Sequence, residues 1–185
     1  MNLFVVIPFY KNEKELESCK SALKDQIPHT LIVADDQNGD GFTANANRGI
    51  VEAVTHPEFS FGTSVVVLVN QDCQMEPGAL KALADFVESH PKAGLVSVKQ
   101  LAQDREHIVH GGTLEAFPAG RHEGGLKSKG DCKRSKKVPW CNFACVAIRG
   151  QTILQCGLLD ESMRMFGSDS DYGYTARSRG WECWS

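Results

Sequence analysis

The 185-residue sequence has no apolar run long enough to cross a bilayer as a helix, which needs about 20 residues. Its first apolar run, residues 3–7, is too short for a signal peptide, and no basic residue precedes it. The net charge of -3 offers no positive excess for nucleic acid or an anionic membrane. We therefore expect a cytoplasmic protein with no transmembrane segment and no nucleic-acid partner, and association with the inner face of the membrane stays open.

Two common signatures of binding sites are also absent. The sequence contains neither a P-loop nor a G-x-G-x-x-G motif, so no glycine-rich loop is available to cradle phosphates. Its seven cysteines are odd in number and scattered, and the one close pair, Cys141 and Cys145, has no second pair to complete a zinc pattern. We expect reduced thiols, and we expect any pyrophosphate ligand to be bound through a metal ion.

The first hundred residues alternate between strand and helix patterns. Residues 65–69 are consecutive apolar residues, which is typical of a central strand buried on both faces of a parallel sheet. Helices are predicted between the strands, one opened by Asn12 and Glu15 as a capping pattern and one opened by Pro77. The other predicted strands are residues 3–7, 30–34 and 95–98. The fold class is α/β, a mainly parallel, doubly wound, Rossmann-like sheet with helices on both faces, in a single domain.

The pattern changes after Gln100. Residues 101–137 show no sustained periodicity, and we expect them to be irregular. A strand is predicted within residues 140–148 and a short helix over 151–156. A last helix is predicted from Asp169 to Arg179, with Gly180 as its C-terminal cap.

Carboxylates follow two of the predicted parallel strands and open the last helix. Asp35 and Asp36 end one strand, Asp72 follows residues 65–69, and Asp169 and Asp171 begin the helix. Ligands of open α/β sheets bind beyond the carboxyl ends of the strands. Oxygen ligands of this kind suit Mg²⁺ or Mn²⁺ holding a phosphate-bearing substrate. A simple turn is the alternative for residues 70–72, because Asn and Asp are common turn formers.

These motifs together resemble a known family. Val5-Val6-Ile7-Pro8-Phe9-Tyr10, Asp35-Asp36, Asn70-Gln71-Asp72 and Ser168-Asp169-Ser170-Asp171 stand in the order and spacing of family 2 glycosyltransferases. Asn47-Arg48-Gly49 and residues 75–80 extend the similarity to nearly the whole chain. The resemblance implies an inverting enzyme of the GT-A fold and is nearest to the rhamnosyltransferase-like branch.

The resemblance also implies roles for individual residues. Pro8 and Phe9 would border the nucleotide base, with Glu13 nearby, and Asp35 would accept a hydrogen bond from the base. Asp72 matches the metal-binding position of the family's D-x-D motif. The implied donor-binding set is Pro8, Phe9, Glu13, Asp35, Asp36, Asn47, Arg48 and Asn70. For Asn47 and Arg48, helix capping and a solvated charge are equal alternatives.

Asp169 matches the catalytic base, supported by Asp171 and Arg177, and its alternative role is that of an N-cap. The chain departs from the family at two of these positions. Asn70 replaces the first acid of D-x-D, and Ser168 stands where relatives usually carry Glu. The chain also ends at Ser185, before the region where relatives often supply a metal-binding His, so we expect either a trimmed or a naturally short chain.

The resulting hypothesis is a metal-dependent, inverting glycosyltransferase for surface polysaccharide synthesis. It would move a sugar from a UDP- or dTDP-linked donor to a glycan or lipid-linked acceptor, using Mg²⁺ or Mn²⁺. Residues 1–100 would form the nucleotide-binding half and residues 101–185 the acceptor and catalytic half. The alternatives are a non-catalytic nucleotide-sugar-binding domain and a nucleotidyltransferase, although the latter calls for a glycine-rich basic loop that residues 8–13 do not provide.

Residues 127–137 are strongly basic, with one opposing carboxylate at Asp131. The cations are Lys127, Lys129, Lys133, Arg134, Lys136 and Lys137. A solvated loop is one interpretation. The other is attraction of an anionic acceptor, such as a lipid-linked or phosphorylated glycan.

Overall fold

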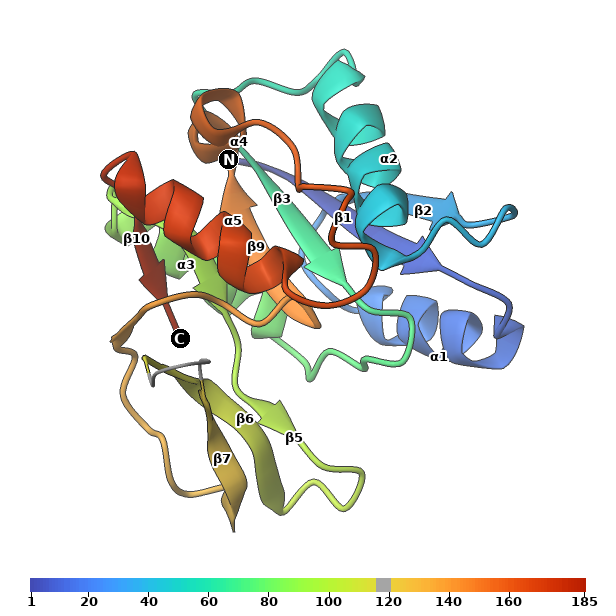
Figure 1. The fold of residues 1–185 in the computed structure, drawn as a ribbon. Helices are drawn as coiled ribbons and strands as arrows, with labels where there is room; N and C mark the ends of the chain where they lie inside the picture. Colours follow the sequence, from blue (N-terminus) through green and yellow to red (C-terminus); the bar gives the residue numbers. More distant parts are fainter. Residues whose placement is uncertain (116–120) are drawn as a thin grey trace.

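A computed structural model describes residues 1–115 and 121–185, with only the backbone described for residues 122–126. A seven-stranded sheet with the order β2-β1-β3-β9-β4-β10-β8 forms the centre of the molecule (Figure 1). Its first four strands in the sequence are β1 (Asn2–Phe9), β2 (Thr30–Asp35), β3 (Ser64–Val69) and β4 (Ala93–Ser97). All four coincide with predicted strands.

Three helices connect these strands: α1 (Glu13–Leu23), α2 (Phe42–Thr55) and α3 (Ala79–Ser89). The Asn12 side chain caps α1 by accepting the Glu15 backbone N–H at 3.4 Å, as the capping pattern predicts. The prediction that Pro77 opens α3 is wrong by two residues, because the left-handed Gly78 is the N-cap and the helix begins at Ala79. Within the described ranges, no helix is long and apolar enough to cross a membrane.

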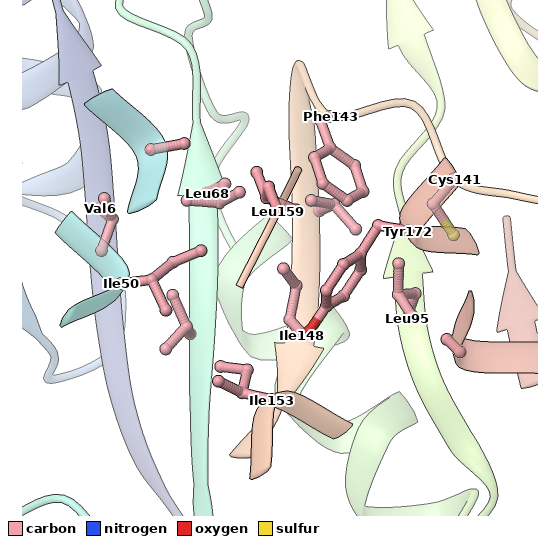
Figure 2. Packing of buried hydrophobic residues seen from close by; sticks show 14 of the residues in the cluster. Val6, Ile50, Leu68, Leu95, Cys141, Phe143, Ile148, Ile153, Leu159 and Tyr172 are labelled. Atoms are coloured by element: carbon pink, nitrogen blue, oxygen red, sulfur yellow. The ribbon is translucent and has the colours of Figure 1, made fainter. Parts of the chain in front are cut away.

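Helices cover both faces of the sheet, which confirms the doubly wound architecture. One face packs against α1 and α3, whose buried side chains are Leu16, Cys19, Leu23, Leu80, Leu83 and Val87. The other face packs against α2, α4 (Gly150–Cys156) and α5 (Ser168–Ser178). Figure 2 shows this second core, where Ile50 of α2 and Tyr172 of α5 lie over Leu68 and Ile148 of the sheet.

Strand β9 (Cys145–Arg149) lies between β3 and β4 and is antiparallel to both. Residues 140–144, predicted to belong to this strand, precede it as irregular chain. Strand β10 (Glu182–Trp184) is parallel to β4 and antiparallel to β8 (Lys137–Val138). Five of the seven strands therefore share one direction, and the sheet is mainly parallel as predicted.

A second, three-stranded antiparallel sheet corrects the expectation that residues 101–137 are irregular. It consists of β5 (Gln100–Leu101), β6 (His107–Leu114) and β7 (Arg121–Ser128). Figure 1 shows it beyond the C-terminal end of β10. These strands were not predicted because β6 contains two glycines and two histidines and does not alternate regularly between apolar and polar residues.

Candidate active site

The carboxyl ends of β1, β2 and β3 lie at one edge of the sheet. Strand β1 pairs in parallel with β2, with Phe9 opposite Asp35, and in parallel with β3, with Val6 opposite Leu68. Asp35 is thus the last residue of β2 at the edge where the chain leaves β3 towards Asp72. This confirms the prediction that these two carboxylates share one edge.

Gln71 holds two of the loops at this edge together. Its Oε1 accepts the Tyr10 backbone N–H at 2.7 Å, and its Nε2 donates to the Tyr10 carbonyl and to Glu15 Oε2, each at 3.2 Å. The loop after β3 is thereby fixed to the start of α1. This role could not be predicted, because nothing in the Asn70-Gln71-Asp72 motif indicates which partner the central side chain takes.

The neighbouring carboxylates Asp35 and Asp36 differ completely in environment. Asp35 is exposed and accepts a hydrogen bond from Gln37 Nε2 at 3.3 Å. Asp36 is only 5% exposed and accepts the backbone N–H groups of Asp40 and Gly41 at 2.9 and 3.0 Å. Burial by itself raises the pKa of Asp36, but those N–H groups and the guanidinium of Arg48 outweigh it, and the pKa is lowered overall. Asp36 therefore organises the loop after β2, and Asp35 is the one that faces solvent.

Arg48 and Asn47 also serve the loops of this edge. Arg48 donates to Asp40 at 2.8 Å and to Asp36 at 3.0 Å. Asn47 is buried: its Nδ2 donates to the Leu159 carbonyl and to Glu161, and its Oδ1 accepts the Leu159 N–H, each at 2.9 Å. Neither residue caps a helix, and both polar atoms of the Asn47 side chain are already hydrogen-bonded within the protein. We assign Asn47 a structural role and do not propose it as a donor contact.

The remaining residues predicted to bind the sugar donor differ in how far they are exposed to solvent. Pro8 is buried within β1, and the Phe9 side chain is packed in the core beneath α1 and α3. The Phe9 carbonyl accepts Asp36 N–H and Asn45 Nδ2, both at 2.9 Å. Glu13 is exposed at the start of α1, and Asn70 is half-buried at the end of β3. Their contacts with a donor stay predictions.

Asp72 is an exposed carboxylate beside two protonated thiols. Burial, and secondly the charge of Asp72, raise the pKa of Cys19 to about 11 and that of Cys73 to about 12. These thiols are therefore not available as thiolate ligands near neutral pH, and the edge offers oxygen atoms instead. No group of three His, Cys, Asp or Glu side chains within residues 1–115 and 121–185 could hold a metal ion. A single carboxylate fits Mg²⁺ or Mn²⁺ that is completed by substrate phosphates.

The loop from α4 to α5 brings Asp169 towards the same set of loops. Thr43 of α2 donates its hydroxyl to the Met163 carbonyl and its backbone N–H to the Arg164 carbonyl, the latter at 3.2 Å. The Arg164 guanidinium donates to the Gly39 carbonyl in the loop after β2. Figure 1 shows this loop passing α2 before it enters α5. The loop carrying Asp36 is thus bonded to the segment that leads into Asp169.

Asp169 is the second residue of α5, and the N-cap is Gly167, so the alternative that Asp169 caps the helix is wrong. Asp169 Oδ1 accepts the Ser170 backbone N–H at 2.8 Å. Asp169 and Asp171 both lie in the first turn, at the positive end of the helix dipole.

The position of α5 is fixed at its middle and at its end. A Cβ on Gly173 would lie 2.4 Å from the Trp140 Cβ, so the helix can approach this segment only where it has a glycine. Arg177, in the last turn, donates to Glu115 at 2.6 Å. The helix ends with Gly180 N–H bonded to the Arg177 carbonyl and Trp181 N–H to that of Ala176, which confirms the predicted glycine cap.

Solved structures with this fold are GT-A glycosyltransferases. GalNAc-T7 with UDP, GalNAc and Mn²⁺ superposes with a TM-score of 0.70 at 11% identity, over 100% of this chain and 42% of that one. S. aureus TarS 1-349 gives a TM-score of 0.63 at 14% identity, over 95% of this chain and 55% of that one. The mannosyltransferase PcManGT from Pyrobaculum calidifontis, in complex with GDP-Man and Mn²⁺, gives 0.59 at 14%, over 98% and 53%. These likenesses establish the fold.

The sequence establishes the family. The model of the glycosyltransferase-like family 2 matches residues 1–185, and the chain belongs to this family. A curated relative is the N-acetylglucosaminyl-diphospho-decaprenol L-rhamnosyltransferase of Mycobacterium tuberculosis, 26% identical over 129 residues. That match covers 63% of this chain and 42% of the relative, so the chain spans less than half the length of the curated relative.

Proposed function

We propose that this chain carries the catalytic domain of a metal-dependent, inverting glycosyltransferase that uses a nucleotide-diphosphate sugar. The proposal rests on the loops at the carboxyl edge of the sheet, which hydrogen bonds hold together. These loops present Asp35 and Asp72, and hydrogen bonds from Thr43 and Arg164 connect them to the segment leading into Asp169. The family match over the whole chain gives the reaction class.

The part of the site that binds the sugar donor would recognise its nucleotide base and bind its diphosphate. Asp35 is exposed at the end of β2, where it can accept a hydrogen bond from the base. Asp72, with the donor phosphates, would hold Mg²⁺ or Mn²⁺. The bound ion would neutralise the charge of the leaving diphosphate.

Asp169 would act as the general base. Its carboxylate takes the proton of the acceptor hydroxyl while the hydroxyl oxygen forms a bond to the anomeric carbon. The bond from that carbon to the diphosphate oxygen breaks on the opposite face, so the configuration inverts. Such a positioned base contributes about 10²–10⁴-fold.

For the substrates, we propose a UDP- or dTDP-linked sugar and an acceptor attached to a lipid through a diphosphate. The name of the mycobacterial relative describes a rhamnosyl transfer to such an acceptor. Two structural neighbours were solved with UDP or GDP-Man, together with Mn²⁺. A lipid-linked acceptor would place the reaction at the inner face of a membrane, in the synthesis of a surface polysaccharide.

A second candidate is a domain that binds nucleotide sugars without turning them over. Ser168, which stands beside Asp169 where family members usually have Glu, is buried and only 3% exposed. A serine there supplies no second carboxylate to the catalytic turn. This candidate differs from the first in predicting donor binding without even slow donor hydrolysis.

Donor binding in the presence and absence of metal tests the proposal. We expect UDP or dTDP and their sugars to bind at least about tenfold more tightly with Mn²⁺, and to raise the melting temperature accordingly. Asp72→Ala should abolish the dependence on Mn²⁺. Glu76→Ala, which removes an exposed carboxylate of the same loop, should keep it. Equal affinity with Mn²⁺ and with EDTA in the unmodified protein would contradict the metal role.

A further inference from the structure

A basic hollow lies along the chain between β7 and β8. Its volume is about 710 Å³, within the usual range for small-molecule sites. Among the residues that the structure describes, its charged lining is Lys127, Lys133, Arg134 and Lys136, with the carboxylate of Asp131. Lys133 and Arg134 are exposed. The hollow therefore suits a multiply charged anion.

The turn that forms one wall of this hollow is held by hydrogen bonds. The Ser128 N–H donates to Asp131 Oδ2 at 3.1 Å, and the Asp131 N–H donates to the Ser128 carbonyl at 2.8 Å. Lys99 Nζ donates to the Lys129 carbonyl at 2.9 Å and to that of Asp131 at 3.5 Å. Asp131 thus stabilises the turn, and its single carboxylate stands against several cations in the lining.

Two glycines of β6 lie against two residues that line the hollow. A Cβ on Gly111 would lie 2.8 Å from Cys132 Sγ, and one on Gly112 would lie 3.1 Å from Lys136 Cε. Both Cys132 and Lys136 are half-buried as a result. Lys136 is fixed further by a pair of backbone hydrogen bonds with Ser185, at 2.8 and 3.0 Å. The hollow is therefore built on the small sheet and does not depend on long surface side chains alone.

The small sheet contacts the loop that carries Asp72. Lys129 Nζ lies 3.9 Å from Glu76 Oε2, and Arg105 donates to Gln74 Oε1 at 3.5 Å. Both partners follow Asp72 in the same loop. Lys136 also lines a second hollow of about 400 Å³, which is bordered by Arg177 of α5. Turns of the small sheet thus contact the loop after β3, and Lys136 is shared with a hollow bordered by α5.

We propose that this hollow binds the phosphate groups of the acceptor, with Lys133 and Arg134 as their principal ligands. The inference rests on the proposed function, and it assigns the acceptor subsite that the donor residues leave undefined. Arg134 can bind two phosphate oxygens through its planar guanidinium, and the lysines add point charges. The acceptor's diphosphate is bound on the small sheet, while its sugar hydroxyl extends towards the acidic edge.

Direct binding of inorganic pyrophosphate in EDTA tests the subsite without turnover. We expect chemical-shift changes of backbone amides within residues 127–137 on titration. The double variant Lys133→Gln/Arg134→Gln should lose these changes and weaken binding at least about tenfold, since each lost charge-assisted contact amounts to roughly a factor of ten or more. The matched control Lys24→Gln/Lys92→Gln removes two exposed cations elsewhere and should bind normally. Absent or evenly distributed shifts, or equal loss in both double variants, would overturn the proposal.

Kinetics identifies the source of the phosphate. The Lys133→Gln/Arg134→Gln variant should raise the KM for an acceptor linked through a diphosphate at least about tenfold, and leave the KM of the donor and of the matching uncharged acceptor unchanged. Loss of binding to vesicles with anionic headgroups, with no change in acceptor KM, would instead make the hollow a membrane contact and overturn the assignment. If no acceptor reacts but pyrophosphate still binds in the hollow, the proposed glycosyl transfer is wrong. The hollow would then remain an anion-binding site.

Discussion

Asp35 and Asp36 are adjacent carboxylates that the chain uses for opposite purposes. Strand alternation turns one outward and the other inward, where three donors surround it. The lowered pKa of Asp36 means that its ionised form stabilises the fold. This stabilisation is complete above the unfolded pKa of about 3.9 and disappears as the pH falls through the lower pKa of the folded state.

Asp36→Asn should therefore lower the free energy of unfolding at pH 7 by about 2 kcal/mol, the cost of disrupting buried hydrogen bonds to a charged group. Urea unfolding between pH 7 and pH 2 should show the difference from the unmodified protein shrinking below about pH 4. Asp35→Asn is the matched control: it should leave stability unchanged and weaken nucleoside binding. A difference in stability that is constant with pH would exclude an ionised Asp36 as its cause.

Asp169→Asn separates catalysis from helix stability. Asparagine keeps the Oδ1 that accepts the Ser170 N–H, but it cannot take a proton from the acceptor hydroxyl. We expect a near-normal melting temperature and donor affinity, with transfer reduced at least about a hundredfold. Asp171→Asn, in the same first turn, serves as the comparison. Loss of transfer in Asp171→Asn with retention in Asp169→Asn would move the base to Asp171.

Local sequence patterns predicted single residues where a function is local. Asn12 caps α1 and Gly180 ends α5 because each role depends on neighbours within a few positions. Asn47 and Gln71 could not be assigned in this way. Their partners lie 112 and 61 residues away, and only the folded chain brings them together.

At the scale of elements, Arg149 joins three segments at the end of β9. Its guanidinium donates to the carbonyls of Val87, His90 and Ala93, at 2.5, 3.0 and 3.0 Å. These carbonyls lie at the end of α3, in the connection that follows it and at the start of β4. Burial lowers the pKa of Arg149, in keeping with a cation enclosed by carbonyl groups.

Arg149→Met should destabilise the protein by about 3 kcal/mol, roughly 1 kcal/mol for each carbonyl left without its donor. Arg149→Lys should recover part of the loss, because one ammonium cannot reach all three positions. Denaturant midpoints measure both changes, and Arg179→Met, at an exposed position, is the control. A loss below about 0.5 kcal/mol in Arg149→Met would show that water replaces the guanidinium.

Elements with strong apolar patterns were predicted well, and elements defined by distant pairing were not. Strands β1 to β4 are long apolar runs, and their helices have one apolar face. Strands β6 and β7 depend on each other for their hydrogen bonds, and their glycine- and histidine-rich sequences carry little periodicity. The direction of β9 could not be predicted either, because a run of apolar residues is equally compatible with parallel and antiparallel pairing.

At the scale of the whole molecule, the two halves of the chain share one sheet. The first half supplies β1 to β4, and the second half supplies β8, β9 and β10. The proposed division into a nucleotide-binding half and an acceptor half therefore describes stretches of sequence that interleave in space. The alternation of strand and helix patterns predicted the fold and the acidic edge, and the composition showed the basic stretch, whereas the small sheet beside it was not predicted.

The position of β9 has a consequence for how the protein is made. Strands β3 and β4 join the same sheet only through β9, which follows β3 by about eighty residues in the sequence. While the chain leaves the ribosome, the valine-rich edge of β3 stays unpaired until residues 145–149 emerge. At about 5–20 residues per second this interval lasts several seconds, during which an open apolar edge can pair with another chain. We expect newly made chains of this protein to be most prone to aggregation during this interval.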